Sequence, residues 1–239
     1  ISLHDAIEKP LTKIEVVKQH LAAGTNVNSK DLNPERYRES PLHHAVSHAN
    51  KEIVEMLLNY NADVNFKCER GMTPLDGALL WARDVPKYSV IAEIIRNKGG
   101  ESGAKDSIYV AVLVGNIEAV KKHITAGADV ETASIIKPTR TDDYIIEVNG
   151  QTLLTLAASY AKYKEYREIA QELILGGANV NAVQTNIMHF FEGRSSKIYY
   201  TPLDLAQALS KNTPDFNNLR RKHGGKTAEE LGYKNDYGF

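Results

Sequence analysis

The sequence predicts an all-α solenoid of helix–turn–helix units, with β-hairpin insertions between some of the units. Three observations predict this fold. A short opening segment recurs, an apolar segment of helical spacing follows each copy, and a Gly- or Asn-containing turn ends most units. Self-similarity of this kind is the signature of a repeat array. The six opening segments are SLHDA (2–6), SPLHHA (40–45), TPLDGA (73–78), SIYVA (107–111), TLLTLA (152–157) and TPLDLA (201–206).

Each opening segment has the features of a helix start. Ser40 or Thr73 stands where an N-cap oxygen is needed for the first backbone amides. A proline follows at the first helical position, where its missing N–H costs nothing. Leu42 and Ala45 lie three residues apart, hence on one face, where we expect them to pack against the second helix of the unit. The prolines concerned are Pro41, Pro74 and Pro202.

The second segment of each unit predicts a further helix, and the turn after it needs residues that tolerate a positive φ. Gly24, Asn61, Gly127 and Gly177 meet this need. The sixth unit has the weakest second segment. The six segments are IEVVKQHL (14–21), KEIVEMLL (51–58), SVIAEII (89–95), IEAVKKHI (117–124), REIAQELI (167–174) and DFNNLRR (215–221).

Taken together, these units resemble ankyrin repeats, whose pattern is a TPLHxAA opening, a VVxLLL-type second helix and a GADVN turn. The resemblance covers roughly residues 2–228. The family spacing of about 33 residues is kept from Leu42 to Leu75 and from Leu75 to Ile108, whereas the other three steps are longer and require insertions. The resemblance implies that His43, the family's TPLH histidine, hydrogen-bonds between neighbouring repeats.

A second regularity predicts two related three-repeat modules, residues 1–103 and 104–239. The third and sixth repeats both begin with a TPLD opening. Both end in a Gly-Gly segment, IIRNKGGESGAK (94–105) and LRRKHGGKTAEEL (219–231). The first and fourth repeats share IEVVKQHLAAGTNV and IEAVKKHITAGADV. One continuous six-repeat stack with a local irregularity is the alternative, and the pattern leaves both open.

The insertions are where function is expected, because repeats stack through their helices and use their loops for partners. Residues 29–39 lengthen the first turn. Residues 131–150 and 182–200 each contain two β-branched or aromatic runs around a bend, which predicts two hairpins side by side. They either serve structure alone, by pairing with each other and covering an edge, or also bind a partner.

The resemblance implies a protein partner held on a concave face made of turn tips and the exposed side of the first helices. Trp81 and Tyr160 fall at corresponding positions there, and large aromatics often anchor interfaces. The alternative for Trp81 is that it packs on the 82–89 insertion. The predicted partner-binding residues are Tyr37, Arg38, Phe66, Arg70, Met72, Leu80, Trp81, Tyr144, Tyr160, Phe190 and Phe191.

The composition limits the other classes of function. The formal net charge of −1 over 239 residues gives no basic field for nucleic acid, and no apolar run approaches the ~18 residues of a membrane helix. Cys68 is the only cysteine, which excludes an intrachain disulfide and a thiolate cluster and fits a reducing, cytoplasmic compartment. The chain opens at Ile1, which leaves open whether a leader or further domain precedes it. We expect a monomer with no cofactor.

The sequence contains none of the short motifs of phosphate-binding loops, hydrolases, zinc proteases or CxxC sites, so we expect no enzyme. His44 and His48 have an i, i+4 spacing that metal ligands use, but a solvated or capping role is favoured. Cys68 lies in the turn FKCERG, which suggests an exposed loop residue.

Two alternatives stay open at this point. One is an enzyme or metal site built from the inserted loops, for which the candidate residues are Cys68, Asp142, Asp143 and His189. The other follows from the resemblance: a turn asparagine, at Asn28, Asn65 or Asn181, would be a substrate of an asparaginyl hydroxylase.

Overall fold

The computed structural model describes residues 2–8, 14–133, 139–140, 144–190, 195–209, 218 and 221–236. The chain divides into two compact units, Ile1–Val110 and Ala111–Phe239. Helix α7 (Ile108–Leu113) spans this division.

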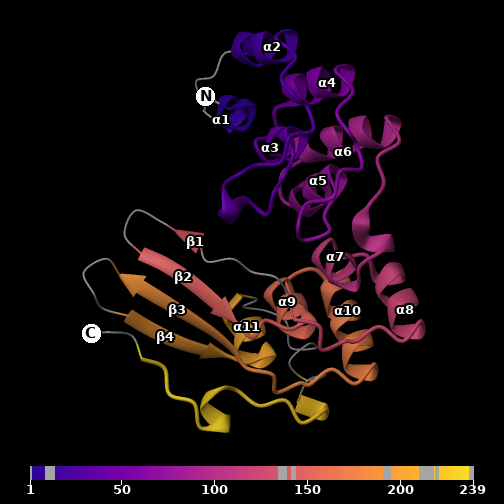
Figure 1. Ribbon diagram of the computed structural model, residues 1–239. Helices are drawn as coiled ribbons and strands as arrows, with labels where there is room; N and C mark the ends of the chain where they lie inside the picture. The colour runs from indigo at the N-terminus through magenta and orange to yellow at the C-terminus, as the bar shows by residue number, and fades with distance from the viewer. Residues whose placement is uncertain are drawn as a thin grey trace. The chain divides into compact units, whose positions relative to one another are not determined.

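The described residues of the first unit contain three successive helix pairs, which confirms the predicted helix–turn–helix repeats. The first helices α1, α3 and α5 contact one another in order, and so do the second helices α2, α4 and α6 (Figure 1). The helices are α1 (Leu3–Glu8), α2 (Ile14–Ala22), α3 (Pro41–Ser47), α4 (Lys51–Asn59), α5 (Pro74–Ala82) and α6 (Lys87–Asn97), with short 3-10 turns at Pro34–Arg36 and Gly103–Lys105.

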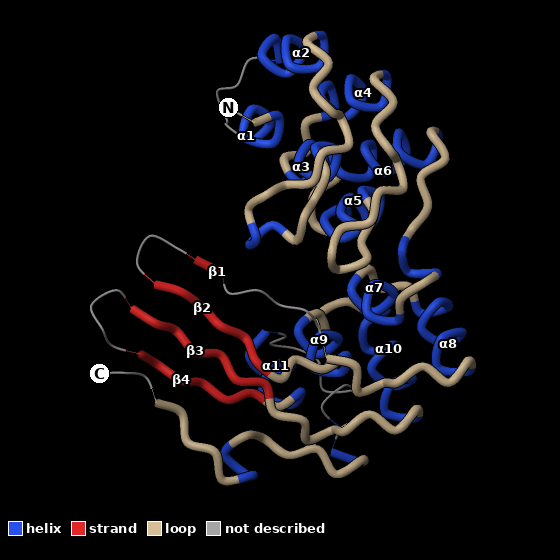
Figure 2. The backbone as a smooth tube through the Cα atoms, in the orientation of Figure 1, coloured by secondary structure: helices blue, strands red, loops and turns tan. Residues whose placement is uncertain are grey.

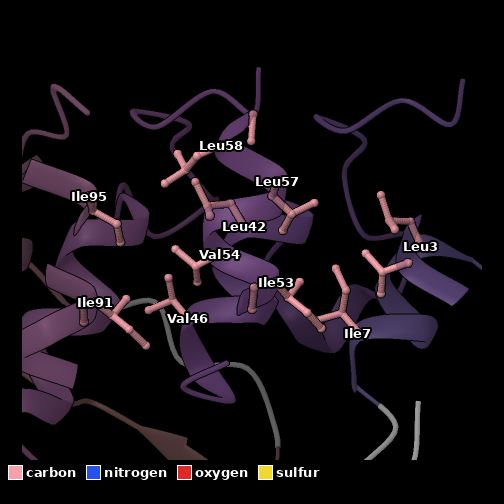
Figure 3. Close-up of a cluster of buried hydrophobic side chains, with 14 of the residues drawn as sticks. Leu3, Ile7, Leu42, Val46, Ile53, Val54, Leu57, Leu58, Ile91 and Ile95 are labelled. Carbon is pink, nitrogen blue, oxygen red and sulfur yellow. The ribbon is translucent and has the colours of Figure 1, made fainter. Parts of the chain in front are cut away.

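A continuous apolar core runs through these helix pairs. Leu42 on α3 and Ile53 and Leu57 on α4 are fully buried. Figure 3 shows them between the labelled side chains of α1 and those of α6. Each helix pair has apolar side chains on the two sides that face the neighbouring pairs, so no pair can bury its apolar surface alone. The core therefore joins the repeats of the unit into one body.

The helices begin where the sequence predicts. Pro41, Pro74 and Pro202 are the first residues of α3, α5 and α11. The hydroxyl of Thr73 accepts a hydrogen bond from the Asp76 amide at 3.4 Å. The predicted turn residues also have positive φ, with values of 78° at Gly24, 61° at Asn61, 84° at Gly127 and 96° at Gly177.

The second unit combines helix pairs with a sheet. Helix α10 contacts both α8 and α9, and α9 contacts α11. The second helix predicted for the sixth repeat lies largely outside the described residues. The helices are α8 (Ile117–Thr125), α9 (Leu153–Ser159), α10 (Lys164–Leu175) and α11 (Pro202–Leu209), with a 3-10 turn at Glu229–Leu231.

The two predicted hairpins are present, and they pair with each other. Four antiparallel strands lie in the order β1-β2-β3-β4 (Figure 2). The first hairpin gives β1 (Thr139–Arg140) and β2 (Tyr144–Asn149), and the second gives β3 (Gln184–Phe190) and β4 (Ser195–Tyr200). Pairing of β2 with β3 joins the hairpins into one sheet, which removes an inner edge from each. The expectation that the hairpins lie side by side is confirmed.

Candidate protein-interaction surface

Trp81 is the most exposed aromatic side chain among the predicted partner-binding residues of the first unit. It lies near the end of α5, and half of its surface (50%) is open. Its ring lies 6.4 Å from the ring of Tyr88, in the predicted 82–89 insertion. Tyr88 is buried, and its hydroxyl donates a 2.7 Å hydrogen bond to the Ser47 carbonyl. Trp81 therefore lies next to Tyr88 and still presents a large apolar surface. Leu80 beside it is half-buried.

The first insertion is fastened to the second turn through three of the predicted residues. The Tyr37 carbonyl accepts a 2.8 Å hydrogen bond from the Glu69 amide, and Arg38 pairs with the Glu69 carboxylate at 3.1 Å. The Arg70 guanidinium lies 4.2 Å from the centre of the Tyr37 ring. Tyr37 and Arg38 have positive φ values of 50° and 52°, a conformation that such contacts must hold in place. These residues form one ordered surface, which we call the turn-tip cluster: Tyr37, Arg38, Glu69 and Arg70.

A half-buried carboxylate lies next to Arg70 of the turn-tip cluster. Glu39 lies 3.8 Å from Arg70 and is half-buried. Burial raises the pKa of Glu39, and the positive charge of Arg70 opposes this rise. The cluster therefore has an internal counter-charge for Arg70, which reduces the charge that this arginine offers to a partner.

Phe66 and Met72 belong to the packing between the second and third repeats. The Phe66 ring meets the His43 ring edge-on at 6.1 Å. His43 donates from Nε2 to the Met72 carbonyl at 3.2 Å, which confirms its predicted bond between neighbouring repeats. The side chain of Met72 is buried, so it is not available to a partner and does not belong to the proposed surface. Phe66 is half-buried and keeps one accessible side.

Tyr160 lies in the second unit, at the C-cap of α9 and therefore one residue later than predicted. Its ring stacks at 5.0 Å on the ring of Tyr166, which is fully buried and whose hydroxyl bonds to the Leu113 carbonyl. Tyr160 is half-buried. It therefore combines a supported ring with an accessible side, as Trp81 does in the first unit.

The sheet of the second unit brings Tyr144 and Phe190 directly opposite each other in adjacent strands. Residues that alternate along a strand lie on opposite faces, and the register makes one face of the sheet richer in apolar residues than the other. The less apolar face carries Glu147 and His189, 3.7 Å apart, together with Ile145 and Ile187. Phe191 lies outside the described residues. The face richer in apolar residues, which we call the apolar face, carries Ile146, Val148, Met188, Phe190 and Ile198, with Gln184, Asn186 and Ser196 among them.

Cys68 is buried, and the expectation of an exposed loop residue is wrong. Its side chain is only 6% exposed, because the Cys68 amide bonds to the Met72 carbonyl and the Gly71 amide bonds back to Cys68, which folds the turn inward. Burial raises the pKa of its thiol, so the thiolate that a nucleophile or metal ligand requires is disfavoured.

The metal and enzyme alternatives gain no geometric support from the described part of the chain. There, no three His, Cys, Asp or Glu side chains gather closely enough to hold a metal ion. His48 caps α3, since its Nδ1 lies 2.9 Å from the His44 carbonyl, which can only accept. His44 instead faces Asp31 at 3.0 Å. Of the loop candidates, Asp142 and Asp143 lie outside the described residues.

Two buried histidines of α3 make the first unit sensitive to acid. Burial lowers the pKa of His43 from 6.5 to about 4, and burial together with the charge of His4 lowers that of His44 to about 4. Both rings are therefore neutral when folded, and they take up protons at a higher pH when unfolded. The stability they contribute is present above pH 6.5 and is lost as the pH falls towards 4.

We therefore expect the free energy of unfolding to fall by about 3 kcal/mol between pH 7 and pH 4 through His43, with His44 acting in the same direction. Urea unfolding at several pH values measures the effect. A His43→Gln variant, which cannot titrate, should give a flatter dependence on pH. A slope that is the same in the variant and in the natural chain would contradict the assignment.

The turn asparagines join successive repeats. The amide oxygen of Asn28 accepts from the Asp63 amide at 2.7 Å. Asn65 accepts from Glu101 and donates to the Gly99 carbonyl, at 2.7 and 3.1 Å. Their side chains therefore have structural partners, and a role as hydroxylation substrates stays a prediction.

Sequence reasoning missed residues whose role depends on contacts between distant segments. Tyr88, which supports Trp81, resembled an ordinary insertion residue. Tyr233, Asn235 and Asp236 lie beyond the repeat pattern, yet they pair with the sheet. An aromatic residue near Asn and Asp after the last repeat was the only signal available for them.

Comparison with known proteins finds ankyrin repeats in both units. The family model "Ankyrin repeats (3 copies)" matches residues 3–106, and the single "Ankyrin repeat" model matches residues 149–185. Ankyrin repeat protein L271 of Acanthamoeba polyphaga mimivirus is 36% identical over 26% of this chain, and mouse (Mus musculus) Rabankyrin-5 is 25% identical over 70% of it. The chain spans only 8% and 13% of the length of these two relatives.

The comparisons with solved structures include the ankyrin repeat domain of human ASB11. It is 20% identical, with a TM-score of 0.42, over 96% of this chain and 90% of that one. Among the residues that the structure describes, no helix has the length and apolar character needed to cross a bilayer.

Proposed function

Because the chain belongs to the ankyrin repeat family, whose members generally mediate protein–protein interactions, we propose that it holds a partner protein on a preformed surface centred on Trp81. The observation that carries the proposal is a half-exposed tryptophan supported by a buried, hydrogen-bonded tyrosine. Rigid aromatic anchors of this kind supply large contact areas at small entropic cost.

The turn-tip cluster supports the same proposal. Its residues come from two successive repeats and are tied by backbone and side-chain bonds. A partner that binds there therefore orders little of this chain, which limits the entropy lost on binding. Phe66 and Leu80 would add apolar contact area within the same unit.

We propose a second binding element in the other unit, formed by Tyr160 and by the apolar face of the sheet. The register that sets Tyr144 opposite Phe190 supports this proposal, because it places one aromatic residue of each hairpin side by side in adjacent strands. The partner would be a protein, and the chain would act on it by binding alone, as a monomer without cofactor or metal. A cytoplasmic setting is supported by the single buried thiol.

We also propose that residues 1–103 and 104–239 are two related modules. Equivalent hydrogen bonds in the two units support this proposal. Asn65 and Asn181 each donate to the carbonyl of a Gly in the Gly-Gly segment, at 3.1 Å in both cases. Asp76 and Asp204, from the two TPLD openings, each accept from the amide of the residue three positions after the Gly-Gly pair, at 2.9 and 2.8 Å.

The proposal predicts a large loss of partner binding on Trp81→Ala. After affinity capture from the source organism identifies the partner, isothermal calorimetry should show an affinity at least thirtyfold weaker, the ~2 kcal/mol typical of an aromatic anchor. The thermal midpoint should change little, since half of the ring is exposed. Tyr160→Ala should weaken binding as well.

A matched control is Tyr60→Ala, which removes another exposed aromatic side chain of the same unit, at the end of α4. It should bind the partner like the natural chain. If Trp81→Ala binds normally but melts early, Trp81 serves packing alone, and the binding surface must be sought on the hairpins.

A further inference from the structure

The segment after the last repeat lies along the outer edge of the sheet. Asp236 forms an antiparallel bridge with Lys197 of β4. The Lys197 amide donates to the Asp236 carbonyl at 2.7 Å, and the Asp236 amide donates to the Lys197 carbonyl at 2.9 Å. We call residues 233–236 the strap.

The strap pairs with the β4 edge partly through backbone hydrogen bonds, as a strand does, and partly through a side chain. The backbone N–H and C=O of Lys197 both bond to the strap. In an antiparallel sheet the backbone groups of successive residues point alternately to either side of the strand, so those of the residues next to Lys197 point to β3 and those of Tyr199 point outward again. The next outward amide, that of Tyr199, donates at 2.9 Å to the side-chain oxygen of Asn235 rather than to a backbone carbonyl. The Tyr233 ring lies 5.0 Å from the Tyr199 ring. An aromatic residue and an asparagine two positions later thus mimic a longer strand.

The strap also has little buried surface against the rest of the unit. All four of its residues are exposed, with 41% of the Tyr233 surface open. A hollow of about 810 Å³ is lined by residues 233–235 of the strap, by the end of β4, by α11 and by residues 227–229. Segments with few buried contacts open at little cost in free energy.

Before the strap, the chain is anchored by a separate set of bonds. The Ala228 amide donates to Asp204 at 2.8 Å, and the Lys226 amide donates to Asn181 at 2.8 Å. Opening of the strap therefore does not require these bonds to break. The contacts at β4 and those at residues 226–228 are separate points of attachment, and the Tyr233 amide, which donates to the Ala228 carbonyl at 2.9 Å, ties the start of the strap to the second of them.

From this arrangement we propose that the β4 edge binds an extended segment of a partner protein, added antiparallel in place of the strap. The strap itself indicates the chemistry of the ligand: an aromatic residue for the Tyr199 ring, and an Asn or Asp two positions later for the Tyr199 amide. Strand addition to a sheet edge takes its affinity from main-chain hydrogen bonds. This surface is distinct from that of Trp81, so either proposal can fail alone.

The tethered strap competes with any such ligand. A short tether gives its attached segment an effective concentration in the millimolar range, so an external strand binds well only when the strap is released or when the strand makes better contacts. Release can be produced by one substitution. Asp236→Pro removes the N–H that bonds to Lys197, whereas Asp236→Ala keeps it and is the matched control.

The experiment follows the amide signals of Lys197 and Tyr199 by NMR in the full chain. The probe is a synthetic peptide with the sequence of residues 230–236, ELGYKND. We expect it to shift both signals in the Asp236→Pro variant with an affinity at least tenfold higher than in the natural chain or in Asp236→Ala. The same peptide N-methylated at its aspartate, which cannot donate to the Lys197 carbonyl, should bind at least tenfold more weakly.

Several results would overturn the proposal. The first is the absence of shifts at Lys197 and Tyr199 in Asp236→Pro at millimolar peptide. The second is equal binding of the N-methylated peptide. The third is a dimer of the variant, detected by light scattering, that excludes the peptide, because the edge would then serve a second copy of this chain. Unchanged signals elsewhere in the sheet establish that the variant remains folded.

Discussion

Replacing Asp76 by alanine is expected to lower the free energy of unfolding by about 3–5 kcal/mol. The Asp76 carboxylate is fully buried and accepts from the backbone amides of Thr73 and Gly103, at 2.8 and 2.9 Å, and from the hydroxyls of Thr73 and Ser102. The hydroxyls can turn to other acceptors, but the two amides cannot. Each buried donor left without a partner costs about 1–3 kcal/mol, and loss of the helix cap adds about 1 kcal/mol.

Urea unfolding of the full chain measures this loss, and Asp76→Asn is the matched control. The asparagine oxygen can take the position of the Asp76 oxygen that meets Thr73 and Gly103, while its NH₂ group faces the Ser102 hydroxyl, which can accept. Most of the stability should therefore return in Asp76→Asn. A loss below about 1 kcal/mol in Asp76→Ala would mean that the two amides find other acceptors, and that Asp76 does not hold the third repeat together.

Leu42→Ala is expected to cost about 2–5 kcal/mol, the range for emptying a packed aliphatic site. Leu42 has no exposed surface and lies within the core that joins the helix pairs of the first unit (Figure 3). Ile53→Ala in the same core, and Leu154→Ala in the second unit, remove equally buried side chains and should act alike.

The control for these core variants is Leu32→Ala. Leu32 lies in the first insertion and is 87% exposed, so its truncation leaves no cavity and should change the free energy of unfolding by less than about 0.5 kcal/mol. Denaturant midpoints of Leu42→Ala and Leu32→Ala that agree within error would show that Leu42 does not support the stack.

The repeats, the helix starts and the turns could be predicted from the sequence because their causes are local. A cap oxygen, a proline at the first helical position and an apolar spacing act within a few residues, as at Thr73 and Pro74. A positive φ at Gly24 or Asn61 follows from the residue itself and the turn around it. The hairpins at 131–150 and 182–200 were also predictable, since alternating runs around a bend specify strands.

The character of the candidate site was decided by contacts between segments far apart in the chain. The sequence singled out Trp81, but the support that Tyr88 gives it, and the docking of Tyr37 on Arg70, depend on how successive repeats stack. Cys68 was expected to be exposed because its turn is polar in sequence. The thiol is buried only because hydrogen bonds between Cys68, Gly71 and Met72 fold the turn inward, and the sequence does not show these bonds.

Sequence by itself thus determined which residues form each repeat, and tertiary structure decided which of them remain accessible. Local rules fix the backbone of a helix or a turn, whereas exposure depends on what the neighbouring repeat covers. The strap is the clearest case, since residues 233–236 lie beyond the repeat pattern and their sequence does not specify which strand they contact. Its bonds to Lys197 and Tyr199 exist because folding brings the edge of β4 alongside it, and an unpaired backbone edge accepts whichever extended segment reaches it.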